Sequence, residues 1–394
     1  MLDFEYYTPT KVVFGRDTED KVGDLAREQG CKKVLIHYGG KSAVRSGLID
    51  RVKASLDRAG IGHVELGGVV PNPRVSLVYK GIELCRAEGV DLILAVGGGS
   101  VIDSSKAIAY GLCYDGDVWD LYEHVATAKA CMPVGCVLTI AAAGSEMSNS
   151  SVISKEEGDL KRAYDDDLAR PKFAVMNPEL TCTLPDYQTS CGCADILMHT
   201  MERYFTSTGS MQVTDALAEG LMRTVIANAL VLVDDPKNYD ARAEVMWSSS
   251  LSHNGLTGCG SDGGDWACHM LEHELGGMYD VAHGAGLAAV WGSWARYVLP
   301  GNEKRFAQFA VNVMGVEDAG DPAATALAGI EAMEGFYRKI AMPTNLAELG
   351  IEPSDDELAE LARKCHASAG GAIGSIRVLE EPDMLAVYRM AAGR

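Results

Sequence analysis

The chain has 394 residues, of which 47% are hydrophobic, and 35 basic against 55 acidic residues give a formal net charge of -20 at pH 7. This length suffices for two domains with separate cores, and the acidic balance argues against nucleic acid and anionic membranes, because neutralising phosphate requires clustered Lys and Arg. The first fifteen residues carry no signal-peptide pattern, and no stretch of the chain approaches the roughly 20 apolar residues of a membrane-spanning helix. The eleven cysteines include no CxxC pair. We therefore expect a cytoplasmic protein with reduced thiols and no membrane association.

Residues 1–184 alternate short β-branched runs with helical patterns. This alternation predicts a doubly wound, Rossmann-like parallel sheet covered by helices, and fully apolar runs such as LILAV fit strands buried on both faces. The expected strands are Lys11 to Phe14, Lys33 to His37, Asp91 to Val96, Pro133 to Thr139 and Phe173 to Met176, and the expected helices are Thr18 to Glu28, Gly47 to Ala59, Val75 to Glu88 and Val101 to Gly111.

A glycine cluster follows the central strand of this half. The run Asp91 to Val96 leads directly into Gly97, Gly98, Gly99 and Ser100, and a helical pattern begins behind them. Glycines let backbone N–H groups approach a pyrophosphate, and the helix N-terminus favours negative charge. The order predicts a nucleotide-binding loop, with Ser100 as the helix N-cap and Asp103 in the capping-box position, although the spacing is not GxGxxG and a simple tight turn is the alternative.

A second glycine pair, Gly39 and Gly40, follows an earlier strand and precedes Lys41 and Ser42. In a Rossmann-like sheet, residues at this position contact the adenosine ribose of the cofactor. An acidic residue at this position binds the 2′-hydroxyl of NAD. No acidic residue stands here, and Lys41 and Arg45 can accept a 2′-phosphate. The segment favours NADP(H) over NAD(H).

After Pro185 strand-like runs almost vanish, so residues 185–394 are predicted to form an all-helical domain joined to the first at a short Pro-marked boundary. The expected helices are Thr214 to Val233, Ala241 to Ser252, Gly264 to Met278, Ala323 to Ile340 and Asp355 to Ala367.

This second half also concentrates metal-ligating residue types. Asp195 and His199 stand four residues apart, as do His269 and His273, so each pair projects from one face of a helix, and His283 follows closely. One carboxylate and three imidazoles, from Asp195, His199, His269 and His283, suit Zn²⁺ or Fe²⁺. A lone histidine is usually structural, but these four residues together, at these spacings, predict a metal site.

Together these motifs resemble the iron-containing (group III) alcohol dehydrogenases over nearly the whole chain. The resemblance rests on strand-GGGSxxDxxK, GSE at Gly144 to Glu146, Asn177-Pro-Glu-Leu180, DxxxH, HxxxH and a later HG. The run from Gly264 to Leu275 looks most like the butanol dehydrogenase-like branch, which reduces aldehydes with NADPH.

The resemblance implies an N-terminal dinucleotide-binding α/β domain, 1–184, and a C-terminal helical metal domain, 185–394, in a dehydroquinate synthase-like arrangement with the site in the cleft between them, and a homodimer. It implies that Asp195, His199, His269 and His283 bind the metal and that His273 is an active-site histidine that does not. Ala143 departs from the threonine common in the family, which removes one hydroxyl contact to the cofactor. The implied cofactor contacts are Gly39, Gly40, Ser42, Asn72, Gly97, Gly98, Gly99, Ser100, Asp103, Thr139, Ser145, Lys161, Leu180 and Thr183.

The predicted function is hydride transfer between NADP(H) and a small aldehyde or primary alcohol. The metal would polarise the substrate oxygen, and His273 would exchange a proton with solvent or a cofactor hydroxyl, unless it instead orients His269 or binds the metal.

Three other functions remain open from the sequence. His269-Met-Leu-Glu272-His273 matches the HxxEH pattern of zinc metallopeptidases, in which a Glu272→Gln change would abolish turnover that a dehydrogenase would largely keep. A glycerol dehydrogenase-like polyol oxidoreductase using NAD has the same architecture with three protein ligands. A metal- or nucleotide-binding protein without catalysis is the third.

Overall fold

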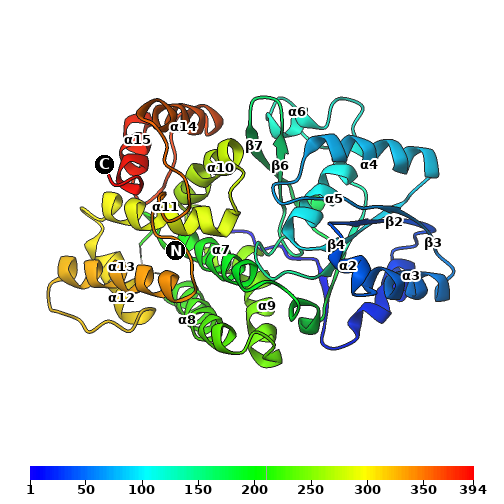
Figure 1. Ribbon diagram of the computed structural model, residues 1–394, viewed down its shortest axis with the longest axis horizontal. Coiled ribbons are helices and arrows are strands. Elements are labelled where there is room, and N and C mark those ends of the chain that lie inside the picture. The colour runs from blue at the N-terminus through cyan, green and yellow to red at the C-terminus, as the bar shows by residue number, and fades with distance from the viewer. Residues whose placement is uncertain (210) are drawn as a thin grey trace. The chain divides into compact units, whose positions relative to one another are not determined.

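The computed structural model describes residues 1–209 and 211–394, which divide into two compact units (Figure 1). Residues Tyr7–Leu184 form one unit, here called the sheet unit. Met1–Tyr6 together with Pro185–Arg394 form the other, here called the helical unit. The first six residues thus pack with a part of the chain that lies almost 180 residues away, which no periodicity in the sequence indicated.

A six-stranded parallel sheet forms the centre of the sheet unit, in the strand order β1-β8-β5-β4-β2-β3. All five predicted strands are present, and the predicted parallel sheet is confirmed. The strands are β1 (Lys11–Phe14), β2 (Lys33–Tyr38), β3 (Gly62–Leu66), β4 (Leu92–Gly97), β5 (Val134–Leu138) and β8 (Phe173–Met176).

Alternate residues of the central strands face opposite layers of helices. Leu92, Leu94 and Val96 of β4 belong to one buried cluster with side chains of α1 and α3, as two-residue periodicity requires. On the other face β4 packs against α5, which in turn packs on α4. The helices of this unit are η1 (Thr18–Lys21), α1 (Val22–Glu28), α2 (Ser42–Arg45), α3 (Leu48–Arg58), α4 (Val75–Glu88), α5 (Gly99–Leu112), α6 (Trp119–Tyr122), η2 (Asp167–Ala169) and η3 (Pro178–Thr181).

A separate antiparallel hairpin, β6 (Ser150–Lys155) and β7 (Leu160–Asp165), extends the sheet unit beyond the main sheet. Like β3, it was not predicted from the sequence. Its strands carry several polar residues and lack the apolar runs that revealed the buried strands. The hairpin packs against α5 and α4 (Figure 1), so it borders the helix that follows the glycine cluster.

Helices make up the helical unit, in agreement with the predicted all-helical half. They pack mainly as sequential pairs, such as α12 with α13 and α14 with α15. The elements are α7 (Asp186–Tyr204), α8 (Gln212–Asp234), α9 (Tyr239–His253), η4 (Leu256–Gly258), α10 (Ala267–Tyr279), α11 (His283–Val298), α12 (Glu303–Asn312), α13 (Pro322–Lys339), α14 (Asp355–Ser368) and α15 (Glu381–Ala391).

One helix of the described residues, α8, is long and apolar enough to cross a membrane by length and composition alone, which differs from the sequence expectation. Its polar residues nevertheless have partners inside the helical unit. Both guanidinium Nη groups of Arg305 donate to the Asp215 carboxylate at 2.7 and 2.8 Å, and Tyr204 donates to Glu219 at 2.9 Å. Because α8 also packs on α7 and α9, these contacts fit a packed helix of this unit.

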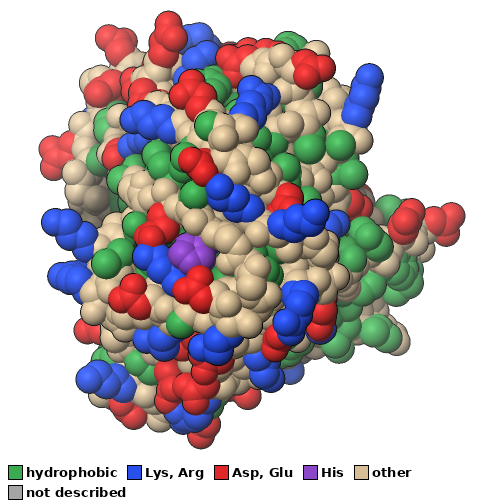
Figure 2. All heavy atoms as spheres, turned by 90° about the vertical axis from the view of Figure 1, so that its right-hand side faces the viewer, with side chains coloured by type: hydrophobic (Ala, Val, Ile, Leu, Met, Phe, Trp, Pro, Cys, Tyr) green, Lys and Arg blue, Asp and Glu red, His purple; other side chains and the backbone are tan. Residues whose placement is uncertain are grey.

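Acidic and basic side chains are interspersed on the face of the molecule seen in Figure 2. The excess of 20 negative charges is therefore not gathered into one acidic patch on this face.

Candidate metal and nucleotide sites

Three helices bring the four predicted metal ligands together in the helical unit. Asp195 and His199 lie one turn apart on α7, His269 lies in the first turn of α10, and His283 is the first residue of α11. The side chains of Asp195, His199 and His269 are buried, and that of His283 is 27% exposed. Residues nearly ninety positions apart in sequence therefore converge on one point.

The donor atoms of Asp195, His199 and His269 lie within 4.8 Å of one another, and that of His283 lies beside Asp195. From Asp195 Oδ1 the distances are 3.2 Å to His199 Nδ1, 3.7 Å to His269 Nε2 and 3.8 Å to His283 Nε2. Metal–ligand bonds of roughly 2.1 Å give tetrahedral ligand–ligand edges of about 3.4 Å. Within the described residues, the buried Asp195 Oδ1, His199 Nδ1 and His269 Nε2 make no hydrogen bond, so a divalent cation at their centre would satisfy all three atoms.

Two glutamates orient the histidine ligands. The Nδ1 atoms of His269 and His283 are hydrogen-bonded to the carboxylates of Glu202 and Glu272 respectively, and the His269 backbone N–H donates to Glu202 at 3.1 Å. Each bond leaves Nε2 facing the centre, and such carboxylate–histidine pairs are typical of metal sites. Sequence reasoning did not identify Glu202, although Asp195, His199 and Glu202 follow the i, i+4, i+7 spacing of one helix face.

The charges around this centre shift the pKa values of the imidazoles in opposite directions. For His269, burial lowers the pKa, but the Glu202 and Asp195 carboxylates outweigh it and raise the value to about 9. For His199, burial lowers the pKa well below 6.5, and His253 and His269 add to the effect. The carboxylates thus attract positive charge to the centre, where binding of a divalent cation would release a proton.

His273 lies one helical turn after His269, with its ring centroid 6.4 Å from that of His269 and 5.9 Å from that of His283. The His269 Nδ1 that an orienting His273 would need is already bonded to Glu202. The His253 ring lies tilted against that of His199 at 4.0 Å between ring centroids, and Arg203 donates to His253 Nδ1 at 3.0 Å.

The HxxEH alternative does not fit this geometry. A peptidase would need Glu272 to face a water molecule on the metal, but the Glu272 side chain is buried and bonded to His283. It would also leave Asp195 and His199 without a role. Because Glu272 orients a predicted ligand, the Glu272→Gln change proposed from the sequence no longer separates a peptidase from a dehydrogenase.

In the sheet unit, the glycine cluster connects β4 to α5 through a tight turn. A Cβ atom on Gly97 would lie 2.4 Å from Val101 Cγ2, one on Gly98 2.8 Å from Ile140 Cβ, and one on Gly99 3.1 Å from Ala143 Cβ. Glycine is therefore required by packing, and the same absence of side chains leaves the backbone at the helix N-terminus open to a phosphate. We call Gly97–Ser100 the phosphate loop.

The predicted capping arrangement of this loop is wrong. Helix α5 starts at Gly99 with Gly98 as its N-cap, so Ser100 lies inside the first turn. Asp103 does not close a capping box, because its carboxylate accepts hydrogen bonds from Ser145 Oγ at 2.6 Å and Val152 N at 3.1 Å. The predicted order of strand, glycine cluster and helix is present, and its role in binding a phosphate stays a prediction.

Parallel strands bring several predicted cofactor residues to the same edge of the sheet. Gly39 follows β2, which pairs with β4 in the register Tyr38↔Val96, and Thr139 follows β5 and donates its N–H to Gly97 O at 3.0 Å. Gly40 and Ser42 continue from Gly39. The carboxyl edge of a doubly wound sheet is where dinucleotides bind.

The remaining predicted contacts lie in other elements. Asn72 precedes α4, Lys161 lies in β7 opposite Ser154, and Leu180 in η3 packs against the sheet core. Thr183 is exposed beyond η3, and Ser145 is bonded to Asp103. Their contacts with a cofactor stay predictions.

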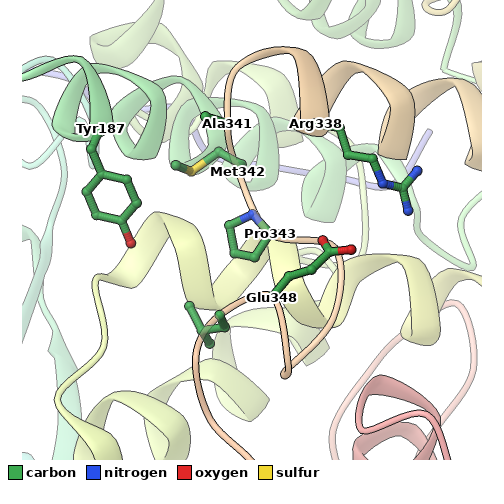
Figure 3. Close-up of a pocket in the computed structure, with 7 residues that line it drawn as sticks. Tyr187, Arg338, Ala341, Met342, Pro343 and Glu348 are labelled. Atoms are coloured by element: carbon green, nitrogen blue, oxygen red, sulfur yellow. The ribbon is translucent and has the colours of Figure 1, made fainter.

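A pocket of about 250 Å³ lies on the helical unit, beside the residues labelled in Figure 3. Figure 3 shows Met342 and Pro343 between Tyr187 of α7 and Arg338 of α13. Arg338 donates to Thr344 at 2.8 Å, and Thr344 donates to Glu348. None of the predicted site residues lines this pocket, and its Arg338 and Glu348 side chains are both bonded to Thr344.

Comparison with known proteins agrees with this geometry. Residues 9–178 match the family described as iron-containing alcohol dehydrogenase, and residues 189–392 match the C-terminal part described for the Fe-containing alcohol dehydrogenase family. Over 390 residues the chain is 41% identical to NADH-dependent butanol dehydrogenase A of Clostridium acetobutylicum, covering 99% of each chain. It is 36% identical over 369 residues to the NADPH-dependent aldehyde reductase YqhD of Escherichia coli, covering 90% of this chain and 91% of that protein.

Solved structures give the same result for the fold. The crystal structure of NADH-dependent butanol dehydrogenase A from Thermotoga maritima matches with a TM-score of 0.96 and 37% identity, covering 100% of this chain and 99% of that one. The crystal structure of Escherichia coli YqhD matches with a TM-score of 0.93 and 32% identity over 99% of each chain. The two family matches and the end-to-end similarity to these relatives show that this chain belongs to the iron-containing alcohol dehydrogenase family of oxidoreductases.

Proposed function

We propose that the protein transfers hydride between NADP(H) and a small aldehyde or primary alcohol, with one divalent metal, Fe²⁺ or Zn²⁺, held by Asp195, His199, His269 and His283. The observation that carries the proposal is the convergence of three buried, unsatisfied donor atoms from Asp195, His199 and His269. His199 supplies the fourth ligand that a three-ligand polyol oxidoreductase lacks.

When bound, the cation acts as a Lewis acid on the substrate oxygen, while the nicotinamide donates or accepts the hydride. The chain's own residues fix the conditions for this chemistry. Glu202 and Glu272 hold His269 and His283 with Nε2 toward the centre, and burial of Asp195 and His199 limits competition from water.

His273 is the proposed proton-exchanging residue, because it lies beside the ligands but its neighbour His269 is already oriented by Glu202. Replacing His273 by Ala should lower kcat by roughly 10²–10⁴-fold, as expected for loss of a general acid–base group. The metal content should not change. Loss of the metal in this variant would instead identify His273 as a ligand.

To test the function, we would measure NADPH oxidation with butanal at 340 nm after reconstitution with Fe²⁺ or Zn²⁺. The wild-type protein should turn over, and Asp195→Asn and His269→Ala should lose both bound metal and activity. His366→Ala is the matched control, because His366 of α14 lies at the surface near Glu380 and Glu381. A wild-type protein that binds metal but reduces no aldehyde in a chain-length panel would favour a non-catalytic binding protein.

The preference for NADP(H) is argued from the segment after β2, where Gly39 and Gly40 replace an acidic residue and Lys41 follows. The relatives include proteins named for either cofactor. The butanol dehydrogenase with 41% identity is named as NADH-dependent, and the aldehyde reductase with 36% identity is named as NADPH-dependent. A Cβ atom on Gly40 would meet nothing within 4 Å, so a side chain can be placed there without steric cost.

This opening permits a sharp test of cofactor preference. Gly40→Asp should lower kcat/KM for NADPH relative to NADH by roughly tenfold or more, since its carboxylate would face the 2′-phosphate. Gly40→Asn has the same shape without the charge and should change the ratio little. A wild-type kcat/KM that is higher with NADH than with NADPH would contradict the preference.

A cytoplasmic location and a homodimer complete the proposal. The acidic composition, which disfavours anionic membrane surfaces, supports the location, and the dimer is argued from the family resemblance. Light scattering of the purified protein would measure its oligomeric state.

A further inference from the structure

Lys106, the last residue of the GGGSxxDxxK motif, has no role in the chemistry proposed above. It lies on α5, two turns after the phosphate loop, and its side chain is completely buried. A buried ammonium group is costly unless oxygen atoms surround it and a counter-charge is near.

Five oxygen atoms surround the Lys106 ammonium. Nζ donates to the backbone oxygens of Ser145, Ser148 and Ser150 at 2.8, 3.0 and 2.7 Å, and to the hydroxyls of Ser145 and Ser148 at 3.0 and 3.3 Å. These distances suit N–H···O bonds and are longer than the 2.0–2.6 Å that Mg²⁺ and Ca²⁺ require. We call these five oxygens of Ser145, Ser148 and Ser150 the cage. Its size suits an ammonium or potassium ion.

Four of the five oxygens can only accept hydrogen bonds from Lys106, which favours the ammonium form. The Ser145 hydroxyl gives its hydrogen to Asp103 Oδ1 at 2.6 Å, so only its lone pairs face Lys106, and the three carbonyl oxygens have no hydrogen to give. Of the five oxygens, only the Ser148 hydroxyl keeps a hydrogen that a neutral amine could accept. Asp103 thereby supplies the counter-charge one hydroxyl away.

Burial and the neighbouring carboxylate act on the Lys106 pKa in opposite directions, and burial has the larger effect. Burial lowers the pKa of Lys106, and the Asp103 carboxylate acts in the opposite direction. Asp103 is fixed from the other side by the backbone N–H of Val152 at the start of the β6–β7 hairpin. The cage thus links α5, the segment Gly144–Ser150 and the hairpin.

The caged segment continues directly from residues that support the phosphate loop. Gly98 and Gly99 lie against Ile140 and Ala143, as the short distances from their ideal Cβ positions show. Gly144 follows at a φ of 63°, and the caged oxygens begin at Ser145. A displacement of Gly144–Ser150 would therefore also move the neighbouring residues against which Gly98 and Gly99 pack.

We propose that the oxygens of Ser145, Ser148 and Ser150 form a monovalent-cation site that the chain fills with its own Lys106 ammonium, and that this internal cation positions the phosphate loop. Lys106 is a positioning residue, since it touches the loop's support and not the cofactor. The positioning part rests on the proposed nucleotide-binding function, whereas the cage itself does not.

The test uses Lys106→Ala in the full chain, which leaves a space with the shape of n-propylammonium. At tenfold excess over its dissociation constant, n-propylammonium chloride should raise the Tm of the variant by roughly 3–6 °C relative to tetramethylammonium chloride at equal ionic strength. Wild-type protein should show no difference between the two salts. Equal Tm values of the variant in both salts would overturn the cage.

Lys106→Met is the matched control, because it retains the side-chain volume without the charge and leaves no space for the amine. It should show no response to n-propylammonium, and a response equal to that of Lys106→Ala would also overturn the proposal. If Lys106→Ala does not fold in buffer alone, the yield of refolded protein in the two salts replaces Tm, and equal yields count against the cage.

Positioning is measured separately by titrating NADPH into each protein. Lys106→Ala should weaken NADPH binding by roughly 10–100-fold, as expected for displaced binding groups, with n-propylammonium restoring most of the loss and the metal content unchanged. Unchanged NADPH affinity would overturn the positioning role. Failure of the wild-type protein to bind either dinucleotide would instead reject the proposed function, while the Tm comparison would still decide the cage.

Discussion

Glu202 accepts two hydrogen bonds from His269, one from the ring Nδ1 and one from the backbone N–H. The two bonds fix both the ring orientation and the position of α10 relative to α7. A carboxylate in this place also increases the basicity of the Nε2 that faces the centre. Glu202 would therefore influence a metal at the proposed site through His269 without binding it.

Replacing Glu202 by Gln should weaken metal binding by roughly 10–100-fold, the range seen when the orienting partner of a ligand is lost. The amide retains the shape and hydrogen-bonding capacity of the side chain, so the helices should stay in place. Competition with a chelator would measure the metal dissociation constant.

Glu334→Gln is the matched control for this experiment. Glu334 is another largely buried glutamate of the helical unit, but its carboxylate pairs with Arg296, with which it forms two hydrogen bonds. The Glu334→Gln variant should be less stable than the wild-type protein but should bind the metal with the same affinity. Equal metal loss in both variants would show that Glu202 contributes only to general stability.

At the level of single residues, the sequence predicted the four candidate ligands because spacing along a helix is a local property. Glu272 was noticed only for its match to HxxEH, and its bond to His283 depends on how α10 and α11 pack. Glu202 lies on the same helix face as Asp195 and His199, so a search for acidic residues at i+7 would have found it. Contacts such as Lys106 with Ser148 join residues 42 positions apart and leave no periodic trace.

Elements were predicted where their residues form a short, fully apolar run or repeat with the period of a helix. Strands such as β4 and β8 were evident because all their residues are apolar, and α4 and α14 because polar and apolar residues alternate with helical period. Helix α11 escaped prediction because nearly all its residues are apolar or glycine, which erases the period. The β6–β7 hairpin escaped because its polar strands depend on tertiary contacts.

Two glycines of α13 allow packing and helix propensity to be separated within one element. A Cβ atom on Gly335 would meet nothing within 4 Å, whereas one on Gly329 would lie 2.4 Å from Ala310 Cβ on α12. Gly335→Ala should stabilise the protein by about 1 kcal/mol, because alanine favours the helix and loses less backbone entropy. Gly329→Ala should destabilise it by about 1–3 kcal/mol through overpacking.

Urea unfolding of the two variants would measure both changes in the free energy of unfolding. The variants differ only in position along the same helix, so each serves as the control for the other. Similar effects of the two substitutions would mean that the α12–α13 contact does not limit the volume at Gly329.

On the scale of the whole molecule, the chain separates its two kinds of chemistry into different units. The glycine turns that suit a dinucleotide lie in the sheet unit, and every candidate metal ligand lies in the helical unit. Strand and helix patterns alternate in the sheet unit, whereas helix patterns predominate in the helical unit. This difference allowed the fold class to be predicted from periodicity. The return of Met1–Tyr6 to the helical unit could not, since Leu2 N donates to Gly260 O across more than 250 residues.

The helical unit also concentrates buried negative charge. Asp195, Glu202, Asp265, Glu272 and Glu274 are all buried, and burial raises the pKa of Asp265 to about 7. Buried carboxylates without a compensating cation destabilise a fold. The metal should therefore stabilise this unit as well as serve the reaction.

Removing the metal with a chelator should lower the Tm of the helical unit by roughly 10 °C, since a ligand at about a thousandfold excess over its dissociation constant contributes about 4 kcal/mol. Differential scanning calorimetry would record the change, with readdition of Fe²⁺ or Zn²⁺ as the reversal. Asp195→Asn, which lacks a ligand, should have a low Tm that the chelator no longer changes. NADPH should still raise the Tm of the chelated wild-type protein, because the phosphate loop belongs to the sheet unit. If chelation left the calorimetric profile of the wild-type protein unchanged, the buried carboxylates would have to be balanced by groups of the chain itself, and the metal centre would lose its structural role.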